Sequence, residues 1–172
     1  MKKIGVFYGS STGTTKNVAE IIAVAMKGDG RKYEVDLFDV ADSKPSDVAN
    51  YEVLILGSST WGCGDLQDDW CDYILGLKEL DLRDKTIALF GCGDETMSDT
   101  FCGAVGELYR HLQNTGAKFI APFDASEYTF DETTAFVNGQ YVGLLLDEVN
   151  HADLSGKRIK DWTDKVKKEI EE

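Results

Sequence analysis

Residues 3–15 decide the fold: Lys3-Ile-Gly-Val-Phe-Tyr8 runs directly into Gly9-Ser-Ser-Thr-Gly-Thr-Thr15. The apolar run predicts a β-strand. Apolar residues at positions 18, 21, 22 and 25 then follow the i, i+3, i+4, i+7 spacing of one helix face. A strand that passes through a short loop of glycines and hydroxyls into a helix is typical of the first unit of an α/β sheet.

The alternation of strand-like and helical stretches continues to the end of the chain. The further strand-like stretches are 33–39, 52–57, 86–91 and 118–121, with 141–146 continuing the last one after a polar interruption. A weak helix or a turn is expected at 44–50. The clearer helical stretches are 66–77, 101–114 and a last helix that Ser155 can cap. This order predicts an α/β fold of three layers, a doubly wound, five-stranded parallel sheet with helices on both faces.

The size and composition indicate a single globular domain, residues 1–172. The chain has 172 residues and a mass of 19.0 kDa, and 42% of its residues are hydrophobic. No apolar run approaches the roughly 20 residues of a membrane span, and the N-terminus leads into a strand instead of a signal peptide. We therefore expect a cytoplasmic protein with no membrane partner. We also expect a monomer.

Acidic residues dominate the charge, with 31 Asp and Glu against 18 Lys and Arg and a net charge of −13. Segment 58–101 holds ten acids and three bases, and segment 124–154 holds seven acids and no base. Such a surface repels phosphate backbones, so we expect no nucleic acid or anionic membrane as a partner. The acids could serve solubility alone, but their concentration favours an acidic face that steers basic partners.

The cysteines and histidines do not indicate a metal site. The cysteines lie at positions 63, 71, 92 and 102, without a Cys-x-x-Cys spacing, and the histidines at 111 and 151 stand alone. Zinc and iron–sulfur sites need clustered ligands, so the sequence predicts free thiols and no metal. A Cys–His nucleophilic pair stays open, but no local motif supports one, and we assign no catalytic residue.

The first loop, residues 9–15, suits a phosphate group. Its hydroxyls and glycines, together with the free amides of a helix N-terminus, can hold an anion without a basic side chain. The loop lacks the Gly-x-Gly-x-x-Gly of dinucleotide sites and the Gly-Lys-Ser/Thr of P-loops. The alternative is an ordinary Ser/Thr-rich turn between a strand and a helix.

Two more loops follow strands and hold unusual residues. In Gly57-Ser-Ser-Thr-Trp-Gly-Cys-Gly64, a tryptophan stands among small residues, where it could stack on a flat heterocycle or fold back over the sheet edge. The loop Gly91-Cys-Gly-Asp-Glu-Thr-Met-Ser-Asp-Thr100 combines glycines with acids and could be a plain acidic loop. Because all three loops follow strands of one sheet, we expect them to surround one ligand.

These three loops, in this order, resemble those of the flavodoxins. Ser-x-Thr-Gly-x-Thr at 10–15 looks like the family's FMN phosphate loop, and Ser-Thr-Trp-Gly at 59–62 resembles its first flavin-stacking loop. Gly91-Cys-Gly-Asp94 followed by Phe101-Cys-Gly-Ala-Val105 is similar to the second flavin loop and the helix after it. The resemblance covers the whole chain and implies the strand order 2-1-3-4-5. The polar segment 124–140, which splits the fifth strand, is similar to the insertion of the long-chain branch.

The resemblance implies a binding site for one noncovalent FMN. Its residues are Ser10, Ser11, Thr12, Gly13, Thr14, Thr15, Ser58, Ser59, Thr60, Trp61, Gly62, Cys63, Gly64, Cys92, Gly93, Asp94, Met97, Asp99, Cys102 and Asp147. Asp147 is assigned to the ribityl chain. Flavodoxins usually have a tyrosine in the second flavin loop, where it stacks on the outer face of the flavin ring. This chain departs from that pattern, because no tyrosine occurs between Gly91 and Phe101. The resemblance therefore places Met97 or Ser98 at the position that covers the outer flavin face.

The function that the resemblance implies is that of a low-potential, one-electron carrier and not an enzyme. Its partners are expected to be basic-faced redox enzymes, such as ferredoxin/flavodoxin–NADP reductase or 2-oxoacid oxidoreductases. The acids expected around the exposed ring edge are Asp65, Asp68, Asp69, Asp94, Glu95 and Asp99. The alternatives are an FMN-dependent quinone or azo-type reductase and an FMN-binding module without a redox role.

Overall fold

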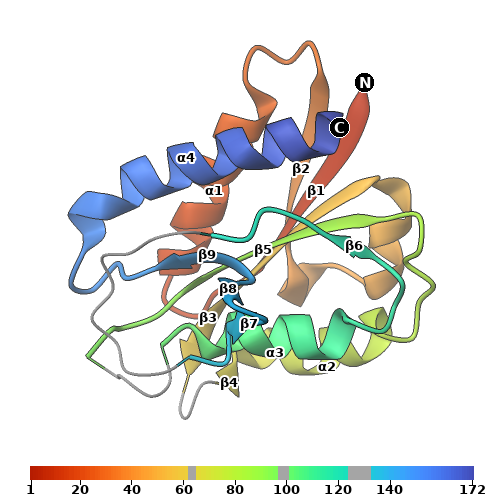
Figure 1. Ribbon diagram of the computed structural model, residues 1–172. Helices are drawn as coiled ribbons and strands as arrows, with labels where there is room; N and C mark the ends of the chain where they lie inside the picture. Colours follow the sequence, from red (N-terminus) through yellow and green to blue (C-terminus); the bar gives the residue numbers. More distant parts are fainter. Residues whose placement is uncertain (62–64, 97–100, 124–132) are drawn as a thin grey trace.

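Five parallel strands form the central sheet (Figure 1) of this computed structural model, which describes residues 1–61, 65–96, 101–123 and 133–172. In spatial order the strands are β2 (Tyr33–Asp39), β1 (Lys2–Gly9), β3 (Val53–Trp61), β5 (Thr86–Cys92) and an outer strand in two pieces, β6 (Lys118–Phe119) and β9 (Gly143–Leu146). Each neighbouring pair is parallel. The predicted order 2-1-3-4-5 is confirmed.

The two pieces of the outer strand keep one register along β5. Phe119 of β6 lies opposite Ile87, and Gly143 of β9 lies opposite Leu89, two positions further along. Between the pieces, β7 (Phe136–Val137) and β8 (Gln140–Tyr141) form an antiparallel hairpin. The split fifth strand is therefore confirmed, whereas residues 124–132 of the polar segment lie outside the described residues.

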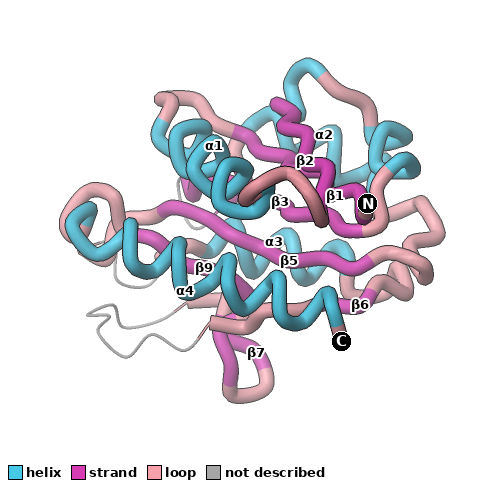
Figure 2. Tube along the Cα trace, turned by 90° about the horizontal axis from the view of Figure 1, so that it is seen from above, coloured by secondary structure: helices cyan, strands magenta, loops and turns pink. Residues whose placement is uncertain are grey.

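Helices cover both faces of the sheet (Figures 1 and 2). Helices α1 (Thr14–Lys27) and α4 (Ala152–Glu171) pack on one face, and α2 (Asp68–Leu77) and α3 (Gly103–Leu112) on the other. Side chains of β3 alternate between the two cores: Ile55 joins the α1/α4 side, and Leu54 and Leu56 join the α2/α3 side. This burial on both faces explains the nearly unbroken apolar runs of the central strands.

Some element boundaries differ from the sequence-based expectation. The helix expected at 66–77 begins at Asp68, because Asp65–Leu66 forms a short strand, β4, antiparallel to the end of β3. The stretch at 44–50 contains a 3₁₀ helix, Pro45–Asn50, after a shorter one at Val40–Asp42. None of the helices in the described residues has the length and apolar character that a membrane span requires.

The expectation that Ser155 caps the last helix is wrong. Helix α4 already begins at Ala152, and Ser155 is buried inside it. The helix starts early because the preceding turn is closed by Asp147, whose carboxylate accepts the N–H groups of Val149 and Asn150 at 3.0 and 2.8 Å.

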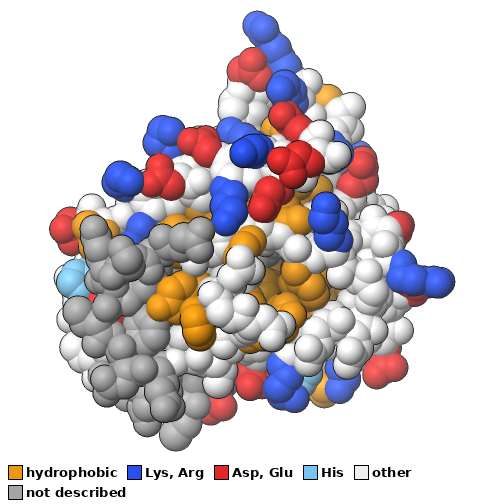
Figure 3. All heavy atoms as spheres, in the orientation of Figure 1, with side chains coloured by type: hydrophobic (Ala, Val, Ile, Leu, Met, Phe, Trp, Pro, Cys, Tyr) orange, Lys and Arg blue, Asp and Glu red, His pale blue; other side chains and the backbone are white. Residues whose placement is uncertain are grey.

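The face that carries α4 and the hairpin has mixed charge. Figure 3 shows Lys and Arg side chains interspersed with Asp and Glu over α4, where Lys157 pairs with Asp161 and Lys160 with Asp164 at 2.7 and 2.8 Å.

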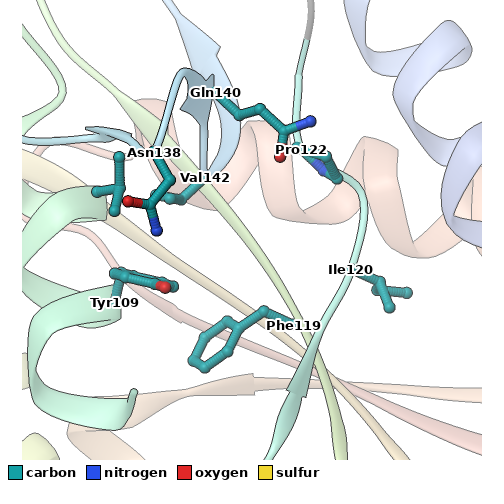
Figure 4. A pocket seen from close by; sticks show the side chains of 8 residues that line it. Tyr109, Phe119, Ile120, Pro122, Asn138, Gln140 and Val142 are labelled. Carbon is teal, nitrogen blue, oxygen red and sulfur yellow. The ribbon is translucent and has the colours of Figure 1, made fainter.

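Beside the hairpin lies a hollow of about 210 Å³, with Tyr109 and Phe119 on one side and Asn138 and Gln140 on the other (Figure 4). This hollow adjoins β6, away from the carboxyl ends of β1, β3 and β5. It is therefore separate from the three loops that the sequence singles out.

Candidate functional site

The carboxyl ends of β1, β3 and β5 are aligned in one row of the sheet. Gly9 lies opposite Ser58, and Ser58 lies opposite Gly91. One position further, Ser59 lies opposite Cys92. The three loops therefore leave the same edge of the sheet from adjacent strands, where open α/β sheets bind their ligands.

The first loop leaves the N-terminus of α1 open. Gly13 has a φ of 92°, which glycine adopts at little cost, and its N–H donates to Ser10 Oγ at 3.1 Å. Among the described residues no side chain caps α1, and no acid lies in its first turn. The helix dipole and the amides of this turn therefore favour an anion. The exposed hydroxyls beside it belong to Ser11, Thr12 and Thr14.

Thr15 provides the observation most specific to a ligand. Its side chain is fully buried, and its Oγ1 has no hydrogen-bond partner among the described residues. A polar neighbour is the Cys92 thiol, which is a weak partner. Burial raises the pKa of Cys92 to about 12, with the Thr15 hydroxyl acting in the opposite direction. A phosphate oxygen at the start of α1 would satisfy this hydroxyl, so the loop fits a phosphate group.

Trp61 extends from the end of β3 into solvent. Its side chain is 43% exposed, whereas Trp70 and Trp162 are 0% and 1% exposed in the two cores. The indole Nε1 of Trp61 donates to Ser59 Oγ at 3.0 Å, which fixes the ring. Of the two interpretations of this tryptophan, exposure favours a stacking surface over a cover for the sheet edge.

The side chains around Trp61 mostly hold the loops together. Ser58 is buried and accepts the N–H of Gln67 at 3.1 Å, and Thr60 accepts the N–H of Ala104 at the start of α3 at 3.2 Å. Gln67, which the sequence analysis missed, is 2% exposed and donates to Ser11 Oγ at 3.0 Å. It therefore ties the first loop to the N-terminus of α2. Gly62, Cys63 and Gly64 lie outside the described residues.

The third loop begins with a tight turn around Asp94. Asp94 Oδ1 accepts the N–H and the hydroxyl of Thr96 at 2.8 and 2.5 Å, and these bonds, with one from Asn150, hold the pKa of Asp94 below its usual range. Gly93 N–H donates to Leu146 O at 2.9 Å. Asp94 therefore keeps a negative charge beside the first two loops. Met97, Ser98 and Asp99 lie outside the described residues.

The two buried cysteines face the protein interior. Cys92 lies in the core on the α1/α4 side. Cys102 has a φ of 48°, and its thiol lies 3.8 Å from Gly91 O and 3.7 Å from Leu146 O. Burial raises the pKa of Cys102 well above its ordinary value. Both thiols therefore stay protonated, and any contact of Cys92 or Cys102 with a ligand is left to the backbone.

Asp147 lies fully buried at the end of β9, and all its acceptor positions are occupied. Its Oδ1 accepts the N–H groups of Val149 and Asn150, and its Oδ2 accepts Glu95 N–H at 3.1 Å and Asn150 Nδ2 at 2.9 Å. Asp147, Glu95 and His151 have ligand-type atoms within 4.8 Å of one another. A carboxylate that accepts four N–H groups has little capacity left for a cation, so we do not assign a metal to this cluster.

Glu95 corrects one expectation from the sequence. It was expected among the acids at the surface, but it is 2% exposed, and its Oε2 lies 2.9 Å from His151 Nε2. His151 and Asn150 were missed as site residues, because nothing local in the sequence connects them with residues 93–96. Asp65, Asp68 and Asp69 are exposed as expected.

A groove of about 450 Å³ runs between α2 and α3, next to Trp61. Leu66, Ile74 and Leu75 contribute apolar side chains to it. Acids that also line the groove are Asp65, Asp68 and Glu107. The surface beside Trp61 is therefore apolar in its interior and negative around it.

Comparison with known proteins agrees with this geometry. The family model described as Flavodoxin matches residues 6–162. A flavodoxin of Synechocystis sp. is 39% identical over 168 residues, with 97% of each chain covered, and a flavodoxin of Buchnera aphidicola is 37% identical, with 96% of each covered. The crystal structure of Fusobacterium nucleatum flavodoxin bound to flavin mononucleotide superposes with a TM-score of 0.91 at 33% identity, covering 98% of this chain and 99% of that one. The chain belongs to the flavodoxin family.

Proposed function

We propose that this protein binds one FMN noncovalently and carries electrons one at a time, at low potential, between larger redox enzymes. The observation that carries the proposal is the buried, unsatisfied Thr15 hydroxyl at the uncapped N-terminus of α1, on the same sheet edge as the exposed Trp61. Membership of the flavodoxin family and the FMN-bound relative from Fusobacterium nucleatum support it.

The residues divide into a phosphate part and a ring part. Hydroxyls and amides of residues 10–15 hold the phosphate, and Trp61 with the loops at 57–64 and 91–99 holds the ring. FMN, when bound, supplies reversible electron transfer at its ring. The assigned ribityl contact of Asp147 competes with the four N–H groups that it already accepts, so we assign Asp147 first to holding residues 95 and 150 in place.

The partners proposed are redox enzymes with a basic face, such as ferredoxin/flavodoxin–NADP reductase or a 2-oxoacid oxidoreductase. The net charge of −13 and the acid-lined groove beside Trp61 support an electrostatic encounter that brings a partner to the ring edge. We further infer that the protein acts as a cytoplasmic monomer of one domain and belongs to the long-chain branch of its family.

Anaerobic reductive titration of the purified protein tests the proposal. We expect one FMN per chain, a visible flavin spectrum and two resolved one-electron steps, without oxidation of NAD(P)H by the protein alone. If the purified protein does not bind FMN, the proposed electron-carrier function is contradicted. Steady oxidation of NAD(P)H with a quinone or azo dye as acceptor would instead support the alternative, an FMN-dependent reductase.

A further inference from the structure

Residues 93–96 are held by the segment that follows β9, far away in the sequence. Glu95 donates its backbone N–H to Asp147 Oδ2 at 3.1 Å. Asn150 Nδ2 bridges Asp147 and Asp94, at 2.9 and 2.7 Å. The position of this loop therefore depends on the turn 147–151, which also begins α4.

Two acidic side chains, Glu95 and Asp147, lie close together at this junction, where Asp147 accepts four N–H groups. Glu95 and Asp147 are 2% and 0% exposed, so two carboxylates share a poorly hydrated space. Asp94 lies beside them and is linked through Asn150. Like charges that are buried together repel each other strongly unless a cation or several donors compensate them.

His151 supplies that compensation from the start of α4. Its Nε2 lies 2.9 Å from Glu95 Oε2, and its side chain is 34% exposed, so it can exchange protons with solvent. Among the described residues, the other titratable groups near the pair are Asp147, which belongs to the same cluster, Asp94, which is linked to Asp147 through Asn150, and the buried Cys102 thiol, whose pKa burial raises well above its ordinary value. Among the described residues, the imidazole of His151 is the group that lies where a positive charge would face Glu95.

We propose that His151 is a positioning residue, which acts through Glu95 as a pH-sensitive latch on the loop 93–96. Protonated His151 forms an ion pair with Glu95 and holds the loop against the turn 147–151. Neutral His151 keeps at most a hydrogen bond, and the repulsion between Glu95 and Asp147 is then less compensated. This inference rests on the proposed function, because the loop 93–96 is part of the flavin site.

The expected consequence is a proton-linked flavin affinity. A latch that holds the loop in its binding position favours bound flavin, so affinity should fall as a rising pH removes the proton from His151. The FMN phosphate also changes its charge with pH. Riboflavin, which has no phosphate, separates the two effects.

The test compares the dissociation constants of riboflavin and FMN at pH 5.5 and 8.5 for three proteins. In the wild-type chain the constant for riboflavin should rise by about tenfold between these pH values. His151→Gln keeps a hydrogen-bond donor without the charge. In this variant the ratio of the riboflavin dissociation constant at pH 8.5 to that at pH 5.5 should be near one. The matched control is His111→Gln. His111 lies on α3, with its Nε2 3.7 Å from Glu107 Oε2, so this substitution should leave the wild-type ratio unchanged.

A second variant keeps the test decisive if His151→Gln fails to fold. Glu95→Gln retains an acceptor for His151 and removes one buried carboxylate, so it should also flatten the profile. If His151→Gln and Glu95→Gln both fold normally by circular dichroism and both keep the wild-type ratio of riboflavin dissociation constants, the proposed role of His151 is refuted. A wild-type protein that binds neither flavin overturns the proposed function instead.

Discussion

Replacing Thr15 by valine should change FMN affinity and apoprotein stability in opposite directions. Valine has nearly the shape of threonine, so the packing at the start of α1 is kept and the hydroxyl alone is lost. That hydroxyl is fully buried and has no hydrogen-bond partner among the described residues. Because an unsatisfied buried group costs free energy, its removal should raise the free energy of unfolding by about 0.5–1 kcal/mol.

The same change should weaken FMN binding. A hydroxyl that donates to a phosphate oxygen forms a charge-assisted bond, worth about 1.5–3 kcal/mol. The dissociation constant of FMN should therefore rise by about 10-fold to 150-fold. Binding should persist, because the amides at the N-terminus of α1 are unchanged.

Urea unfolding of the apoprotein and titration of FMN fluorescence measure the two quantities. Thr115→Val is the matched control, because Thr115 is 8% exposed and its Oγ1 donates to Leu112 O at 2.7 Å, at the end of α3 away from the loops. It should lower the free energy of unfolding by about 1 kcal/mol and leave FMN affinity unchanged. If Thr15→Val loses stability like the control and binds FMN normally, the phosphate assignment is refuted.

Three further changes test other parts of the site and the fold. Trp61→Ala should weaken FMN binding by about 0.5–1.5 kcal/mol and leave more flavin fluorescence, since the exposed ring is lost; unchanged quenching contradicts stacking. Reversing Asp65 and Asp68 to lysine should slow reduction by a basic reductase at low salt and converge with wild type at high salt, whereas Asp164→Lys on α4 should not. The Tyr33 hydroxyl, and then Lys32, hold the pKa of Glu171 below its usual range, so the stability from this bond exists at neutral pH and is lost as the pH falls. Tyr33→Phe should therefore lower Tm at pH 7, with a difference that shrinks towards pH 3 or so; a constant difference argues against it.

The strands could be predicted because their causes are local, whereas their order was implied by the resemblance of the three loops to those of the flavodoxins. Segments 52–57 and 86–91 are apolar on both faces, and only central parallel strands bury both. The loop 9–15 could be singled out as a candidate in the same way, because its glycines and hydroxyls stand between a strand and a helix, where an anion can bind. Trp61 stayed ambiguous, since whether a tryptophan is exposed depends on the packing of α2 and α3.

The remainder of the site depends on contacts between distant segments. Glu95 and His151 are separated by 55 intervening residues, and their pairing requires the end of β9 to lie beside the end of β5. In the sequence, Glu95 is one acid among many. The start of α4 was missed for the same reason: the capping pattern at Ser155 is local, but the Asp147 carboxylate closes the turn before it.

The aligned row of Gly9, Ser58 and Gly91 separates the foundation of the site from its chemistry. A Cβ atom at Gly9 would come within 2.5 Å of Trp70 Cδ1, and one at Gly91 within 2.3 Å of Val105 Cγ2. Glycine is needed there for close packing beneath the loops, independently of any ligand. The close packing beneath the loops is therefore set by the sheet and the helices that cover it, whereas the loops carry the residues that would face a ligand.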